Sequence, residues 1–136
     1  MNNPENTISK ISEEVLTAMP HVLMVMHLRS TEFTWRRLGQ VERGADLLAH
    51  QLSVNEIMKE MMLKDIAQIR TDYESRRHYV DPASDLFQEA MLALQVIQDY
   101  ETRASLVIEN RQDAIRHALS EMQSHQTTQQ ATGARH

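Results

Sequence analysis

Residues 81–123 read DPASDLFQEAMLALQVIQDYETRASLVIENRQDAIRHALSEMQ, and after Pro82 neither glycine nor proline occurs again until Gly133. An aspartate followed by a proline suits the start of a helix, because the carboxylate accepts a free backbone N–H and proline has no N–H to lose. Apolar residues then recur near one stripe as far as Met122. We therefore expect a single helix over 82–123, about 40 residues and about 60 Å long at ~1.5 Å per residue.

This long helix has more apolar length than a chain of 136 residues is expected to cover by itself. We therefore expect its stripe to pair with a second copy of the chain in a homodimer. The residues expected at that interface are Phe87, Met91, Leu94, Ile97, Ala104, Ile108 and Ile115.

The N-terminal part of the chain has the same helical periodicity. Apolar residues recur at three- and four-residue steps from Ile8 to Met26. Pro20 interrupts them, since proline removes a backbone donor and clashes with the preceding turn. We expect either a kink at this proline or two helical pieces over 7–18 and 20–30.

The middle of the chain predicts two further helical segments. One is expected to begin after Ser30, where Ser or Thr can cap a helix. Ser53 and Glu56 have the spacing of a capping box, in which each side chain satisfies a backbone N–H of the other residue. We therefore expect a boundary or a tightened turn near 51–53, followed by a helix that continues through Tyr73.

The composition favours helices throughout. The chain has only three Gly and three Pro, and it is 41% hydrophobic but only 4% aromatic, whereas β-rich chains need turn residues and aromatic or β-branched side chains. We expect an all-α fold, a small bundle of three to four helices with a long C-terminal helix at about 82–123. One domain is expected over 7–123, with disordered ends at 1–6 and 124–136.

Several functional classes are excluded or disfavoured by what the sequence lacks. With no Cys, the chain has no disulfide framework, cysteine nucleophile or iron–sulfur cluster. The start MNNPENTISK does not resemble a signal peptide, and the apolar run 22–28 is too short to cross a bilayer. No P-loop, GxGxxG or GxSxG motif occurs. We expect a cytoplasmic protein that is not an enzyme, uses no cofactor and does not contact a membrane.

Residues 48–54, LAHQLSV, are similar to the segment that closes one helix and opens the recognition helix in many bacterial repressors. The turn position is Ser53 instead of glycine, and the first inward position of the recognition helix would be Lys59, whose charge resists burial. The net charge of −5 also provides no basic excess for phosphates. A DNA-binding transcriptional regulator with a helix-turn-helix around 45–62 is therefore the alternative, and we expect no nucleic-acid partner.

Six of the nine methionines of the chain cluster around 18–27 and 57–62. Flexible thioether side chains form adaptable grooves for protein partners, so we expect these faces to receive an amphipathic helix of another protein. The residues expected to make this contact are Met19, Val22, Leu23, Met26, Met58, Met61 and Met62.

Two clusters have side chains that are able to hold a metal ion. Met24, Met26 and His27 are soft ligands suited to Cu(I), and His117 and Glu121 lie one helical turn apart. A packed core or partner groove explains the first cluster better, and a solvated, ion-paired face explains the second. We expect no metal site.

Residues 74–79, ESRRHY, place Arg76, Arg77 and His78 directly before the turn at Asp81. Guanidinium groups bind phosphates and carboxylates well, so this basic tip is a candidate contact for an anion or an acidic partner helix.

These patterns favour a non-enzymatic protein-binding module, a small helical chaperone, adaptor or anti-activator that acts through its Met-rich amphipathic faces. In outline, amphipathic hairpins, a long last helix and a polar tail resemble the small helical chaperones of flagellar and virulence type III export. This resemblance of architecture implies a secretion-related role.

Overall fold

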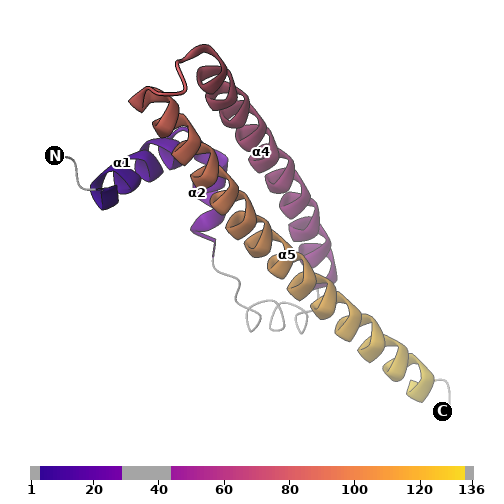
Figure 1. The fold of residues 1–136 in the computed structure, drawn as a ribbon. Helices are drawn as coiled ribbons and strands as arrows, with labels where there is room; N and C mark the ends of the chain where they lie inside the picture. Colours follow the sequence, from indigo (N-terminus) through magenta and orange to yellow (C-terminus); the bar gives the residue numbers. More distant parts are fainter. Residues whose placement is uncertain (1–3, 29–43, 134–136) are drawn as a thin grey trace. The chain divides into compact units, whose positions relative to one another are not determined.

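The computed structural model describes the backbone of residues 4–28 and 44–133, and the side chains of 6–28 and 44–124. In these ranges the chain forms four helices and no strand: α1 (Pro4–Thr17), α2 (Pro20–Met26), α4 (Gly44–Tyr79) and α5 (Asp85–Gly133) (Figure 1). The predicted all-α fold with a long C-terminal helix is confirmed. Over the same ranges, none of the helices combines the length and the apolar composition that crossing a lipid bilayer requires.

The contacts of the chain divide it into two compact units, both of which use α4 and α5. Unit 1 contains α1, α2, the part of α4 from Met58 and the part of α5 up to Leu106. Unit 2 contains the part of α4 up to Ile57 and the part of α5 from Val107. The range 7–123, predicted to form one domain, is thus divided between two units, each with buried side chains of its own.

The predicted break at Pro20 is confirmed, and it separates α1 from α2 in unit 1 (Figure 1). Met19 has φ −121° and ψ 74°, outside the helical region, as expected before a proline. No side chain of this segment caps α2. Asp65 of α4 does so instead, because its Oδ2 accepts the backbone N–H of His21 at 2.7 Å and its Oδ1 lies 2.9 Å from His21 Nδ1. The start of α2 is thereby attached to α4.

Unit 1 has an apolar core to which all four helices contribute. On α1 and α2 the buried residues follow three- and four-residue steps, as an amphipathic pattern predicts. In this unit α4 and α5 are antiparallel, because Arg70 pairs with Glu101 while Arg77 contacts Met91. The buried apolar residues of unit 1 are Ile11, Val15, Met19, Val22, Val25, Met62, Ile66, Ala90, Ala93, Ile97 and Ala104.

Unit 2 has a smaller apolar core. Leu48 of α4 packs with Ile115 and Ala118 of α5, and half-buried Leu52 and Leu119 lie against them. All three central side chains are exposed by 2% or less. The described part of unit 2 consists of one segment of α4 and one segment of α5. Two packed segments can remove only a little apolar surface from water.

Polar side chains are also buried in unit 2. Asn55 is 1% exposed, and its Nδ2 donates to the backbone carbonyl of Ile108 at 3.3 Å. Gln112 is 7% exposed and donates to Glu56. Burial lowers the pKa of the neighbouring Arg111 guanidinium, since desolvation disfavours its charged form. Unit 2 therefore joins α4 to α5 by hydrogen bonds as well as by apolar contact.

The boundary expected near 51–53 is wrong, because α4 continues through this stretch without a turn. The Ser53 hydroxyl donates to the carbonyl of Ala49 at 3.3 Å, the contact that serine makes inside a helix. Glu56 accepts a hydrogen bond from α5 and forms no capping box with Ser53. A helix-turn-helix over 45–62 is therefore not present.

α5 begins at Asp85 and not directly after Asp81. The hydroxyl of Ser84 accepts the backbone N–H of Phe87 at 3.3 Å, which makes Ser84 the N-cap. The Asp81 carboxylate accepts the N–H of Ala83 at 3.0 Å and closes a turn before the helix. Both residues suit a cap, and the sequence prediction chose the first of them.

The helices also extend further toward both ends of the chain than expected. α1 already starts at Pro4, and α5 continues to Gly133, whereas the sequence predicts disorder over 1–6 and 124–136. Ala, Gln and Glu are good helix formers, so a polar end can continue an established helix. The part of the second helix expected over 31–43 lies outside the described residues.

Candidate protein-binding site

Part of the predicted Met-rich surface lies in the core of unit 1. Met19, Val22 and Met62 are completely buried, so in this structure they cannot contact a partner. The sequence prediction that these three residues bind a partner is therefore corrected. A core face and a partner-binding face have the same helical periodicity, so the sequence pattern does not distinguish them. Met61 is 41% exposed and remains accessible. The other predicted contacts are half-buried: Leu23, Met26 and Met58.

The stripe of α5 expected to form a dimer is largely covered within the chain. Ile97 and Ala104 are completely buried in unit 1, and Ile108 and Ile115 are completely buried in unit 2. The expectation underestimated α4, which has 36 residues and packs against α5 in each unit. These four side chains are therefore unavailable to a second copy. The remaining members of the set are half-buried: Phe87, Met91 and Leu94.

Arg76, at the predicted basic tip, is already engaged within unit 1. Its Nη2 donates to Asp72 Oδ2 at 2.9 Å, one helical turn earlier on α4. Its guanidinium carbon lies 4.7 Å from the centre of the Tyr73 ring, within the range of a cation–π contact. The contact with an acidic partner predicted for this residue would have to compete with Asp72.

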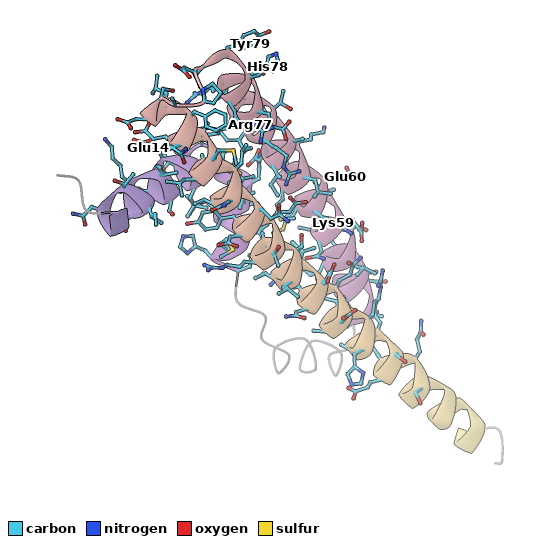
Figure 2. The ribbon with its side chains drawn as sticks, in the orientation of Figure 1. Glu14, Lys59, Glu60, Arg77, His78 and Tyr79 are labelled. Atoms are coloured by element: carbon cyan, nitrogen blue, oxygen red, sulfur yellow. The ribbon has the colours of Figure 1, made fainter. Side chains whose placement is uncertain are left out.

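The two residues after Arg76 also have partners on the chain. Arg77 is half-buried, and its Nη1 lies 3.7 Å from the sulfur of Met91 on α5. The His78 ring meets the Tyr79 ring edge-on, with 5.1 Å between their centres. Figure 2 shows His78 and Tyr79 at the end of α4. The basic tip thus packs against its surroundings and does not form a free cationic cluster.

A pocket of about 400 Å³ is formed in unit 1 by the last turns of α4 and the first turns of α5. We call it the tip pocket. Three charged side chains also line it, Asp72, Arg76 and Glu89. Most of its lining is apolar and comes from Tyr73, Tyr79, Val80, Leu86 and Ala90.

Two apolar residues of the tip pocket are unusually accessible. Tyr79 is 84% exposed and Leu86 is 63% exposed, although both line the hollow. Single exposed apolar residues are common on protein surfaces, but large apolar side chains gathered around a concavity are typical of binding sites. The tip pocket is therefore the candidate site.

The sequence prediction found Arg76 but missed the pocket beside it. Leu86 precedes Phe87 and lies off the apolar stripe that Phe87 begins. Exposed apolar residues of this kind are common, and Leu106 is another on the same helix, so the pattern alone does not locate the pocket. The concavity itself depends on how α4 approaches α5, which no local pattern contains.

The two groups of residues considered as metal ligands in the sequence are an ion pair on α5 and partly exposed side chains at α2. His117 Nε2 lies 3.0 Å from Glu121 Oε1, and both side chains are about half exposed. Met24 and His27 are exposed on or directly after α2, while Met26 is half-buried. Among the residues that the structure describes, no three His, Asp or Glu side chains gather in a way that would hold a metal ion.

Comparison with family models, with curated proteins and with solved structures finds no match to this chain.

Proposed function

We propose that this chain is a non-enzymatic protein-binding module of the chaperone, adaptor or anti-activator kind, whose tip pocket receives a bulky apolar side chain of a partner. The observation that supports this proposal is the exposure of Tyr79 and Leu86 at the edge of an apolar hollow. Covering apolar surface contributes roughly 25 cal/mol per Å², so a partner that buries both side chains gains binding free energy from them.

A protein segment suits the tip pocket better than a small ligand does. A small molecule seated within about 400 Å³ would leave the outer surfaces of Tyr79 and Leu86 in water. An amphipathic helix laid across the hollow would insert one side chain and cover both residues with its flanks. Tyrosine is also common among the residues that dominate protein interfaces, because its large ring loses little conformational entropy when it is buried.

The accessible residues of the Met-rich faces remain a second, predicted contact area of the same module. Met61 is exposed, and its thioether can adapt to different apolar partners. The proposal assigns the main contact to the tip pocket because that is where exposed apolar side chains surround a hollow.

Photo-crosslinking in the native host tests the proposal. A benzophenone amino acid replaces Leu86 in one variant and Leu106 in the control. Both leucines lie on α5 and are more than half exposed, at 63% and 53%, but only Leu86 lines the pocket. We expect discrete covalent adducts with one or a few proteins from position 86 and none from position 106. Equal labelling from both positions, or none from either, would contradict the proposal.

Substitution then tests whether the pocket provides the affinity. We expect the double variant Tyr79→Ser plus Leu86→Ser to bind the crosslinked partner at least about tenfold more weakly. Leu106→Ser should bind normally. Because all three residues are exposed, each variant should unfold within roughly 0.5 kcal/mol of the unmodified chain. An equal loss of binding in Leu106→Ser would move the contact away from the pocket.

A further inference from the structure

Carboxylates outnumber cations around the tip pocket. The stretch 72–90, which contains all of the pocket's lining residues, has five carboxylates and only two guanidinium groups. Both guanidinium groups have contacts within unit 1, Arg76 with Asp72 and Tyr73, and Arg77 with Met91. Arg76 is therefore paired with a carboxylate, and Arg77 contacts a neutral sulfur and does not line the pocket. The other four carboxylates of the stretch form no ion pair with a described residue.

Glu89 is the unpaired carboxylate that lines the pocket itself. It is exposed on α5 and forms no ion pair with any described residue. Glu89 follows Leu86 by three residues, so the two side chains are neighbours on the helix, with about 5–6 Å between their Cβ atoms. Asp85 adds a second exposed carboxylate in the first turn of α5.

A partner that covers the tip pocket must compensate the Glu89 carboxylate for the hydration that it loses. Removing a carboxylate from water without a compensating contact is costly, whereas a hydrogen-bonded cation compensates for the lost solvation. Among the described residues of the lining, Arg76 is the only cation, and it is paired with Asp72. The compensating charge therefore has to come from the partner.

We infer that the tip pocket takes a basic amphipathic segment of another protein, with a Lys or Arg about one helical turn from its apolar anchor residue. The apolar anchor enters beside Tyr79 and Leu86, and the cation pairs with Glu89. This inference rests on the proposed function, because it specifies the partner of the same pocket. It reverses the sequence prediction of an acidic partner, whose carboxylates would face Glu89.

Selection from a displayed library of random peptides, of about 16 residues each, tests the inference on the full-length chain. Clones are first sorted by whether binding is lost in Tyr79→Ser plus Leu86→Ser and kept in Leu106→Ser. Among the pocket-dependent clones we expect a bulky apolar residue with Lys or Arg three or four positions away. The tightest clone is then made as a synthetic peptide, beside a copy in which every Lys and Arg is replaced by Glu.

Charge reversal in the protein provides the matched measurement. Glu89→Lys should lower the affinity for the basic peptide by about tenfold and raise the affinity for its Glu-containing copy. The reason is that the substitution reverses the charge that the peptide meets in the pocket. Glu109→Lys is the control, since Glu109 is also an exposed glutamate of α5 and lies outside the pocket. It changes the net charge of the chain equally, so it should leave both affinities within about twofold.

The outcomes separate the inference from the proposed function. Pocket-dependent clones that are acidic or uncharged, or that bind Glu89→Lys and Glu109→Lys equally well, would overturn the basic partner and leave a protein-binding pocket. A library that yields no pocket-dependent clone would overturn both.

Discussion

Units 1 and 2 use the same two long helices but are held together in different ways. Unit 1 packs α1 and α2 onto α4 and α5 around an apolar core, and the side chains of its ion pairs are at least partly exposed. Unit 2, in its described part, has only α4 and α5, and its interior includes Asn55 and Gln112. The number of helices decides how much apolar surface a unit can bury, and where that is small, hydrogen bonds contribute more of the contact.

This difference also separates stability from specificity. Apolar contacts are non-directional, so the core of unit 1 can provide stability without fixing every side-chain partner. A buried amide is directional, and Asn55 reaches Ile108 only when α4 and α5 are in the right register. We expect a buried charge to damage both units, and the Asn55 hydrogen bond of unit 2 to contribute more to register than to stability.

The largest effect is expected from Ile97→Asp in unit 1. Ile97 is completely buried, and an unpaired carboxylate at this position should lower the free energy of unfolding by about 4 kcal/mol or more. Leu106→Asp is the control, because Leu106 is 53% exposed on the same helix, and it should cost less than about 0.5 kcal/mol. Urea unfolding followed by circular dichroism measures both.

Amide exchange of the Ile97→Asp variant sharpens the comparison between the units. Exchange should accelerate most in α1 and α2, which belong to unit 1. If amide exchange over 44–57 accelerates equally, the two units unfold together. They would then differ in the composition of their interiors but not in how they open.

An intermediate effect is expected from Asn55→Asp in unit 2. The substitution replaces the Nδ2 donor with an oxygen beside the Ile108 carbonyl and buries a charge, at a cost of about 3 kcal/mol. Asn55→Leu keeps the branched shape and the number of non-hydrogen side-chain atoms, and it removes the buried amide, whose Oδ1 has no hydrogen-bond partner among the described residues. We expect Asn55→Leu to change stability by less than about 1 kcal/mol. If it costs as much as Asn55→Asp, the amide is a source of stability and not only of register.

The smallest effect is expected from Asp65→Ala in unit 1. The substitution removes the acceptor for the His21 backbone N–H at the start of α2, and the loss of a helix cap costs about 1 kcal/mol. Asp99→Ala removes an exposed aspartate of α5 and should have little effect. Amide exchange at His21 and along α2 measures the change. Unchanged exchange in Asp65→Ala would show that burial alone holds α2 in place.

The sequence predicted the helices better than their ends or their partners. Pro20 interrupts a helix locally, so the sequence predicted the position of the break correctly. Ser53 was predicted to cap a helix, because serine suits both a cap and a helix interior, and only the continuation of α4 decides between them. The basic tip led the prediction toward an acidic partner, whereas Asp72 and Tyr73 engage Arg76 beside a largely apolar pocket.

The sequence by itself determined the all-α class, the break before α2 and the long final helix, because each follows from residues within a few turns of one another. Tertiary structure decided which apolar faces became core, and it supplied the contacts made across large separations. Asp65 accepts the N–H of His21, 44 residues away at the start of α2, and Asn55 bonds to a carbonyl 53 residues away. Helical periodicity marks a face that is to be buried, but it does not contain the identity of the surface that will cover it.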